Sequence, residues 1–161
     1  MRNLSPLLVA LATLFTGLFS TQSSAQISFD THASSCEAVR PANGHYLVHK
    51  HEGLENPSTR TTWISCPVTT ESIPIASDHY FIALVYNFGS GPLKLTCIFR
   101  YVDLDTGFRT INRTKTISSG SADLLEWELS SRVIASPNVN CKLPQGAGIA
   151  SILSVSGLGL F

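Results

Sequence analysis

The sequence predicts an all-β protein, an antiparallel β-sandwich cross-linked by two disulfides. Three observations support this fold class. Short segments rich in β-branched and aromatic residues recur about every ten residues, separated by turn residues. Helical periodicity does not extend over any useful length. All four cysteines follow a segment with the features of an export signal, and exported chains meet oxidising conditions.

The N-terminal segment, residues 1–25, is predicted to be a secretory signal peptide. Arg2 supplies a basic start, residues 4–19 are mostly apolar, and Ser23-Ser24-Ala25 offers the small residues that a signal peptidase recognises. The apolar run is too short and too interrupted to span a bilayer, which needs about 20 apolar residues. We therefore expect a secreted or periplasmic protein, with one domain at 26–161 and no transmembrane segment in it.

The strands of this domain are expected in a regular order after residue 60. They are residues 60–68, 79–88, 93–102, 108–117, 124–130, a short strand around Cys141 within 136–148, and 149–158. The segment 26–43 is less regular. Its residues 33–39 could hold a helical turn that Cys36 ties down.

The first two expected strands differ in their surroundings. Residues 60–68, RTTWISCPV, are rich in β-branched and aromatic residues and stop at Pro67, which cannot donate to a strand ladder. Residues 79–88, HYFIALVYNF, are apolar or aromatic at nearly every position, which predicts a strand buried on both faces. Two glycines and a proline within 87–93 then end that strand.

The later strands alternate between apolar and polar positions, which predicts one face on a core and one in water. In residues 93–102 the expected inward residues are Leu93, Leu95, Cys97, Phe99 and Tyr101. In residues 124–130 they are Leu125, Trp127 and Leu129, with Glu126 and Glu128 outward. A turn rich in Asp and Gly joins 93–102 to 108–117 and predicts a hairpin.

The cysteines Cys36, Cys66, Cys97 and Cys141 are expected to form disulfides, because an even count behind an export signal is typical of them. Three pairings are possible. Neighbour spacing favours Cys36–Cys66 with Cys97–Cys141, each stabilising the fold by roughly 3 to 4 kcal/mol through loop closure. A zinc site is disfavoured because the chain has no C-x-x-C motif.

Three segments carry a resemblance to other proteins. They are GLENPSTRTTWISCPV (53–68), LKLTCIFRYVD (93–103) and NVNCKLPQGAGIASI, with its core at 140–152. An Asn ahead of a Cys-Pro pair, a strand ending near Cys, and C-x-L-P-x-G before a final strand resemble a loose group of small secreted bacterial proteins. The resemblance spans about residues 36 to 156. It implies export, two disulfides and a β-sandwich, and it implies no chemical activity.

The charge distribution argues against some classes of partner. The formal net charge of the whole chain is zero, and Arg2 is the only charged residue of the expected signal peptide. A nearly neutral chain without acidic or basic runs has no general attraction to nucleic acid or acidic membranes. We therefore expect no nucleic-acid partner, and the motifs indicate no cofactor.

The histidines at His45, His49 and His51 are weak candidates for a metal site. On a strand all three would face the same way, and imidazole suits Zn and Cu. A metal site needs three or four converging ligands, however, and Leu47 interrupts this row. The alternative is an exposed polar strand or loop.

The hairpin suggests a basic surface. If the four residues 103–106 connect its strands, Val102 pairs with Gly107, and Arg100 faces Arg109. One face would then carry Lys94, Arg100, Arg109, Arg113 and Lys115. Like charges opposite one another are unfavourable unless anions or carboxylates neutralise them. Either the following Glu126 and Glu128 do so, or the face binds an anionic ligand.

Two acidic pairs have ordinary explanations. Glu126 and Glu128 could act as paired catalytic carboxylates, but Glu at alternate positions is typical of a solvated strand face. Asp103 and Asp105 resemble part of a calcium loop, yet the distal Glu is missing, and Asp is common in turns.

The function that we expect from these patterns is a non-catalytic binding or structural module. Its ligand would be a glycan, including an anionic glycan, an envelope component or a protein partner. The alternative is a small metal-dependent or hydrolytic enzyme that uses the region of His45, His49 and His51. A β-sandwich by itself does not distinguish these functions.

Overall fold

The computed structural model describes residues 26–69, 79–103, 105–129 and 134–156. The expected signal peptide at residues 1–25 lies outside this part of the chain. The strands are β1 (Gln26–His32), β2 (Glu37–Ala38), β3 (Val48–Lys50), β4 (Gly53–Glu55), β5 (Thr62–Pro67), β6 (His79–Asn87), β7 (Leu93–Asp103), β8 (Gly107–Ile117), β9 (Ala122–Leu129), β10 (Ile134–Leu143) and β11 (Ala147–Ser156). Two 3-10 helices, η1 (Ala33–Ser35) and η2 (Pro41–Tyr46), lie between the first strands.

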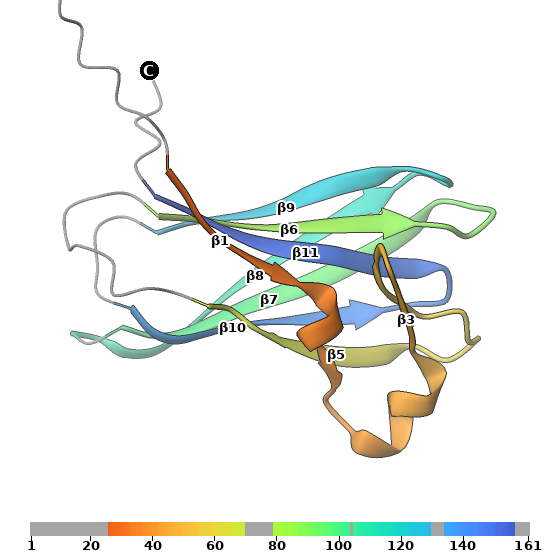
Figure 1. The fold of residues 1–161 in the computed structure, drawn as a ribbon, viewed down its shortest axis with the longest axis horizontal. Helices are drawn as coiled ribbons and strands as arrows, with labels where there is room; N and C mark the ends of the chain where they lie inside the picture. Colours follow the sequence, from red (N-terminus) through yellow and green to blue (C-terminus); the bar gives the residue numbers. More distant parts are fainter. Residues whose placement is uncertain (1–25, 70–78, 104, 130–133, 157–161) are drawn as a thin grey trace, which may run out of the picture.

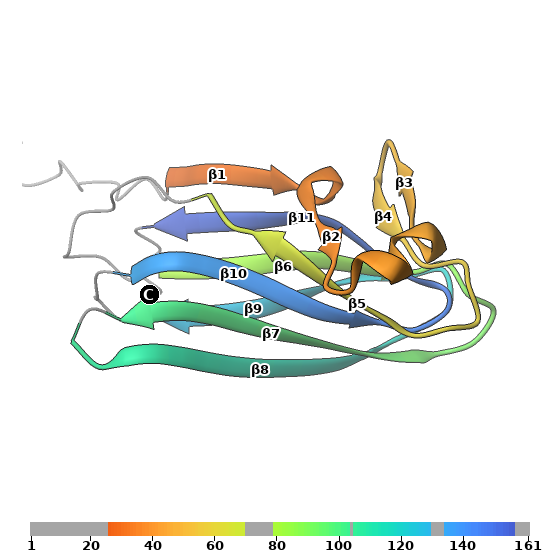
Figure 2. The same ribbon diagram turned by 90° about the horizontal axis from the view of Figure 1, so that it is seen from below.

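The strands form two antiparallel sheets, so the expected β-sandwich is confirmed. Within the described residues, sheet A has the order β3-β4-β11-β6-β9, with β1 also paired to β11. Sheet B has the order β2-β5-β10-β7-β8. Figure 1 shows β9, β6 and β11 in the upper layer and β10 and β5 in the lower layer. The β3–β4 hairpin projects from one end of the sandwich (Figure 2). Among the described residues, no helix has the length and apolar character to cross a bilayer.

An aromatic cluster fills the space between the sheets. Phe81 of sheet A and Phe99 of sheet B stack with their ring centroids 4.6 Å apart. Trp127 of β9 lies 5.8 Å from the Phe99 ring, and all three residues are fully buried. Rings at these separations add specific contacts to the burial of apolar area. The inward positions expected in residues 93–102 and 124–130 therefore face a real core.

Both disulfides pair as expected and are buried in the core. Cys36, just before β2, is bonded to Cys66 of β5. Cys97 of β7 and Cys141 of β10 lie directly opposite each other in sheet B and are also bonded. The Cys97–Cys141 bond links neighbouring strands whose cysteines are 44 residues apart in sequence, so it cross-links β7 to β10 within sheet B.

The expectation that residues 79–88 are buried on both faces was wrong. On β6 the inward residues Phe81, Ala83 and Val85 are fully buried, whereas Ile82 and Leu84 on the other face are partly exposed. The strand lies between β11 and β9 in sheet A, and these neighbours cover its flanks. An antiparallel sheet of a two-layer sandwich packs one face on the core and leaves the other towards solvent, so the outer face of β6 is only partly covered.

The expected register of the β7–β8 hairpin was also wrong. Asp103 pairs with Gly107, so three residues connect the strands instead of four, and Val102 pairs with Phe108. The Asp103 carboxylate accepts hydrogen bonds from the backbone N–H groups of Asp105 and Thr106, each at 2.9 Å. Gly107 has a φ of +79°, which favours glycine. These turn interactions shift the register by one residue, and such a shift moves every side chain of β8 to the other face.

Side chains close the open edge between β8 and β9. The Trp127 Nε1–H donates to the Ile111 carbonyl oxygen at 3.0 Å, and the Arg113 Nε–H donates to the Glu126 carbonyl oxygen at 3.0 Å. The Lys115 ammonium contacts Asp123 Oδ1 at 2.6 Å. An exposed eleven-residue edge strand would otherwise offer free backbone groups to another chain. These contacts occupy part of that edge and connect β8 of sheet B to β9 of sheet A.

The β3–β4 hairpin is attached to sheet A by a buried carboxylate. Glu55, 6% exposed, contacts the Lys50 ammonium at 2.5 Å and accepts a hydrogen bond from the Tyr86 hydroxyl at 3.2 Å. The Tyr86 ring lies against Gly148, where a β-carbon would collide with it. Burial, together with the neighbouring Glu55 charge, raises the pKa of Tyr86 well above its ordinary value. The neutral phenol is therefore part of the folded structure.

This environment predicts a loss of stability in alkali. An unfolded chain releases the tyrosine proton near pH 10, whereas folded Tyr86 retains it because its pKa is raised. The neutral Tyr86 phenol therefore contributes to the free energy of unfolding below about pH 10, and this contribution is lost as the pH rises further. Urea midpoints should fall between pH 9 and 11, and they should fall less in Tyr86→Phe. An equal fall in both proteins would contradict the prediction.

Candidate functional site

The outer face of sheet B carries an ordered array of mostly polar side chains. Positions that alternate with the core residues of β5, β10, β7 and β8 form three rows across the strands. The rows are Trp63, Lys142, Thr96 and Thr114; Glu37, Ser65, Asn140, Ile98 and Asn112; and Pro67, Asn138, Arg100 and Thr110. Neighbouring strands lie about 4.8 Å apart, so each row presents groups at that spacing. We call this surface the polar face.

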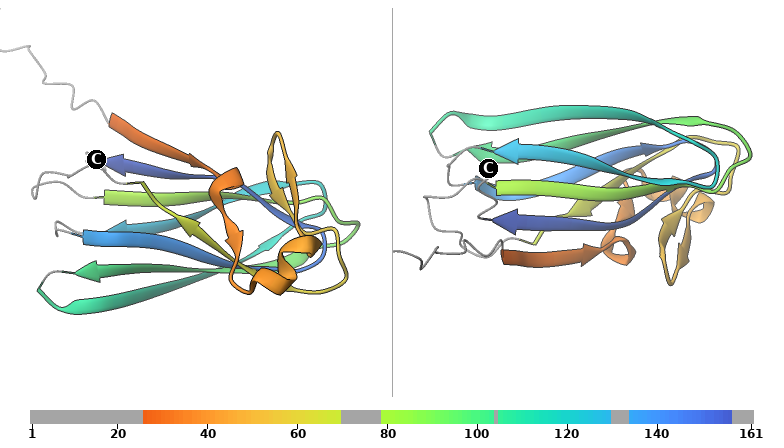
Figure 3. Two further views of the ribbon diagram at one scale, coloured as in Figure 1. Left: turned by 60° about the horizontal axis from the view of Figure 1, so that its bottom comes forward. Right: turned by 90° about the horizontal axis from the view of Figure 1, so that it is seen from above.

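A pocket opens at the β5 side of the polar face. It has a volume of about 590 Å³, and its lining combines Ser65, Asn138 and Asn140 with the segment from Ser35 to Pro41. Figure 3, left, shows β2 and η2 beside β5 on this side of the molecule. The disulfide from Cys36 to Cys66 holds that segment against β5. The pocket wall is therefore attached covalently to the sheet that forms its floor.

Two asparagines on the pocket floor differ in their hydrogen bonding. Asn138 exchanges hydrogen bonds with the Ser65 hydroxyl at 3.0 and 3.2 Å. Asn140 is only 8% exposed, and within the described residues its side-chain amide makes no hydrogen bond. The Asn140 amide is not among the buried polar atoms that lack a partner in the described residues, so its two donors and one acceptor reach the solvent of the pocket. Asn140 therefore presents unbonded donor and acceptor atoms to the pocket.

An exposed aromatic ring lies next to this pocket. Trp63 is two residues before Ser65 on the same face of β5, and 36% of the residue is exposed. Its neighbours across the strands are Lys142 and Val39, whose N–H donates to the Trp63 carbonyl at 2.9 Å. A large, flat and partly exposed ring offers apolar contact area at a small cost in conformational entropy. The polar face thus combines an aromatic platform with hydrogen-bonding groups.

The expected basic surface is divided between two faces. Lys94 and Arg100 lie on the polar face, as alternation along β7 predicts, but the register shift removes the β8 cations from it. Arg109, Arg113 and Lys115 lie on the opposite side of β8, at positions paired with the inward residues of β7. Arg113 and Lys115 bond to β9, and Arg109 donates to the Thr106 hydroxyl at 3.0 Å. Lys142, which the sequence interpretation did not select, joins Lys94 and Arg100 on the polar face.

The histidines do not form the row that a strand would give them. His45 lies in η2, which begins at Pro41, and only Val48–Lys50 is strand, so His45 and His49 belong to different elements. His51 follows β3, and its carbonyl oxygen contacts His32 Nε2 at 3.1 Å. Within the described residues, no group of three or more His, Cys, Asp or Glu side chains could hold a metal ion. The outward Glu126 and Glu128 lie on β9, and Glu128 accepts a hydrogen bond from Tyr80.

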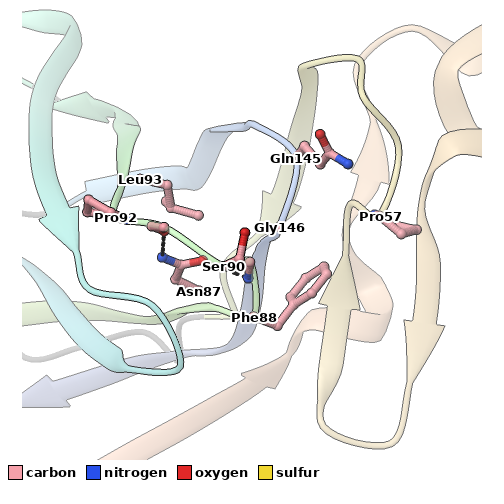
Figure 4. A pocket seen from close by; sticks show the side chains of 10 residues that line it. Pro57, Asn87, Phe88, Ser90, Pro92, Leu93, Gln145 and Gly146 are labelled. Carbon is pink, nitrogen blue, oxygen red and sulfur yellow. Dashed lines mark hydrogen bonds between the residues drawn. The ribbon is translucent and has the colours of Figure 1, made fainter.

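A second pocket lies at the loop end of the sandwich. Its volume is about 420 Å³, and residues 87–93 and 145–146 line most of it, together with Pro57. Figure 4 shows the side chains of Asn87, Phe88 and Gln145 around this space. The Asn87 amide is fully used, since it donates to the carbonyl oxygens of Gly91 and Ile117 and accepts from the Gly89 N–H. This asparagine fixes a loop and leaves no free amide for a ligand.

The sequence interpretation did not select Asn138, Asn140 and Lys142 as candidate site residues. A signal for them was present, because they alternate with Val139, Cys141 and Leu143, all of which are fully buried. Period-2 alternation places such polar residues together on the outer face of a strand. The alternation does not reveal that β5 and β7 are the strands next to β10.

Comparisons with known proteins show the same fold. No protein-family model and no curated protein sequence matches the chain. A structure of the C-terminal family 22 carbohydrate-binding module of Clostridium thermocellum Xyn10B superposes with a TM-score of 0.52 and 10% identity, covering 84% of this chain and 96% of that module. The CBM22-2 xylan-binding domain of Paenibacillus barcinonensis Xyn10C has a TM-score of 0.48 at 10% identity, over 80% of this chain and 98% of that domain. The first of these likenesses shows a shared β-sandwich fold and nothing finer.

Proposed function

We propose that this protein is an exported, non-catalytic carbohydrate-binding module whose ligand lies on the polar face of sheet B. The observation that carries the proposal is the Asn140 amide, which lines a pocket next to the exposed Trp63 ring and makes no hydrogen bond within the described residues. The β-sandwich shared with the Clostridium thermocellum module, which is named for carbohydrate binding, supports the same function by analogy.

Carbohydrates need the two kinds of group that this face combines. A pyranose ring has an apolar face of C–H groups and a rim of hydroxyls. The Trp63 ring offers a flat surface for the apolar face, and the amides of Asn138 and Asn140 can donate to hydroxyls and accept from them. The pocket is open, as a chain-like ligand that continues beyond it would require.

Export is part of the proposal. The segment 1–25 has the features of a signal peptide, and the two buried disulfides require an oxidising environment to form. The resemblance to small secreted bacterial proteins supports the same location, which would be the periplasm or the cell exterior. A carbohydrate-binding module would meet envelope or external glycans there.

The proposal predicts which substitutions abolish binding. The purified domain 26–161 should bind glycans on an array, and titration calorimetry should show at least a tenfold loss of affinity for Trp63→Ala and for Asn140→Ala. Each change removes a contact that a buried polar ligand group or a sugar face cannot replace, at about 1–3 kcal/mol.

Phe88→Ala is the matched control, because Phe88 is a comparably exposed aromatic residue, 41% against 36%, in the second pocket. It should bind glycans as the unaltered protein does, and circular dichroism should show that all three variants are folded. Loss of binding in Phe88→Ala alone would place the ligand at the loop end and contradict the assignment to sheet B.

A further inference from the structure

The charged side chains of the sandwich are divided between its two outer faces. On the polar face of sheet B the cations are Lys94, Arg100 and Lys142, and Glu37 at the β2 edge is the one carboxylate among the described residues. On the outer face of sheet A, β9 presents Glu126 and Glu128. Although the formal net charge of the chain is zero, one outer face of the sandwich is therefore basic and the other is acidic.

The cations of the polar face are not neutralised by the protein. Within the described part of the chain, the ion pairs are Lys50–Glu55 and Lys115–Asp123, and neither involves Lys94, Arg100 or Lys142. All three side chains are exposed. In contrast, Lys115 lowers the pKa of Asp123 by donating a hydrogen bond to its carboxylate. The structure thus uses Lys115 internally and leaves the three cations of the polar face free for a ligand.

Two of these cations flank the pocket asparagines. Arg100 of β7 is the direct neighbour of Asn138, and Lys142 lies two residues beyond Asn140 on the same face of β10. Residues two apart on one strand are about 6.8 Å apart, and diagonal neighbours on adjacent strands are separated by about 7–8 Å. A ligand that hydrogen-bonds to Asn140 therefore has a cation within reach on either side.

We propose that the ligand of the polar face is an acidic glycan, a chain of sugars carrying carboxylate or sulfate groups, with Arg100 and Lys142 binding those groups. This inference rests on the proposed carbohydrate-binding function and adds the chemical class of the glycan. The planar guanidinium of Arg100 presents paired N–H donors that match the two oxygens of a carboxylate or sulfate. The neighbouring asparagines bind the hydroxyls of the same sugar residue.

The test compares glycans that differ only in charge. Calorimetry with polygalacturonate and with its methyl ester, and with dextran sulfate and unmodified dextran, separates carboxylate, sulfate and neutral chains. We expect at least tenfold tighter binding to one acidic polymer than to its neutral counterpart. The affinity should fall at least fivefold in the double variant Arg100→Gln, Lys142→Gln, and it should weaken as salt rises from 50 to 500 mM because exposed charges are screened.

Arg109→Gln is the control for the arginine change, because it removes the same single charge as Arg100→Gln from an exposed arginine on the other side of β8. It should leave the affinity unchanged. Equal affinity for acidic and neutral polymers, or unaltered binding by the double variant, would overturn this inference. In that case, if the protein bound a neutral glycan and Trp63→Ala abolished that binding, the carbohydrate-binding proposal would stand, whereas the inference of an acidic ligand would fall. A failure to bind any glycan, neutral or acidic, would reject both.

Discussion

Replacing Cys97 and Cys141 together by alanine is expected to lower the free energy of unfolding by about 4 kcal/mol. The bond joins residues 44 apart in sequence, and closing a loop of that length removes much of the conformational entropy of the unfolded chain. The two residues are fully buried and opposite each other in sheet B, so the folded state already holds them together. Urea unfolding followed by tryptophan fluorescence measures the change.

The second disulfide provides an internal comparison. Cys36–Cys66 closes a loop of 30 residues, so its replacement by two alanines should cost only about 0.3 kcal/mol less through loop entropy. It also holds the pocket wall next to β5, so its loss should weaken the proposed glycan binding at temperatures where the domain remains folded. If the free energy of unfolding fell by less than about 1 kcal/mol in the variant without Cys97 and Cys141, the cross-link would not be what stabilises sheet B.

Trp127→Ala is expected to destabilise the domain by about 3–5 kcal/mol, the usual cost of removing a large buried aromatic side chain. Trp127 is fully buried, packs against Phe99 across the two sheets, and donates its indole N–H to the Ile111 carbonyl oxygen. The substitution therefore leaves a cavity in the core and frees a backbone acceptor at the edge of β8. Circular dichroism is the suitable probe during urea unfolding, because the change removes one of two tryptophans.

Trp127→Phe separates the two effects. Phenylalanine retains a ring against Phe99 but cannot donate to the Ile111 carbonyl oxygen. The free energy of unfolding should therefore fall much less than in the alanine variant, with about 1 kcal/mol of the decrease due to the lost hydrogen bond. If the edge of β8 is protected by this bond, light scattering should also show faster association of both variants. Equal stability of Trp127→Phe and Trp127→Ala would refute the role assigned to ring packing.

Local sequence patterns predicted most of the later strands. The alternation in residues 93–102 and 124–130 identified the inward residues correctly, because side chains on a strand alternate between faces whatever its partners are. The first part of the chain was harder to interpret. Residues 41–51 form a 3-10 helix and a short strand instead of one longer strand, since Pro41 starts a helical turn that the Leu47 N–H closes on the Gly44 carbonyl.

The basic residues show where local reasoning fails. Arg100 and Arg109 were expected to face each other, but a turn shorter by one residue pairs Arg100 with Thr110. The difference depends on hydrogen bonds from the Asp103 carboxylate within the turn, and composition alone does not distinguish a three-residue connection from a four-residue one. One residue of register decided which cations share a face with the pocket.

The sequence by itself determined the all-β class and the inward faces of the later strands, because each depends on residue type and spacing along a single segment. Among three possible disulfide pairings it only favoured the one that the structure contains. Only the tertiary structure decided that Ser65, Asn140 and Ile98 lie side by side in one row. These residues come from three strands separated by 30 or more positions, and hydrogen-bonded register, which depends on turns and core packing, brings them together. The candidate site exists because of that register.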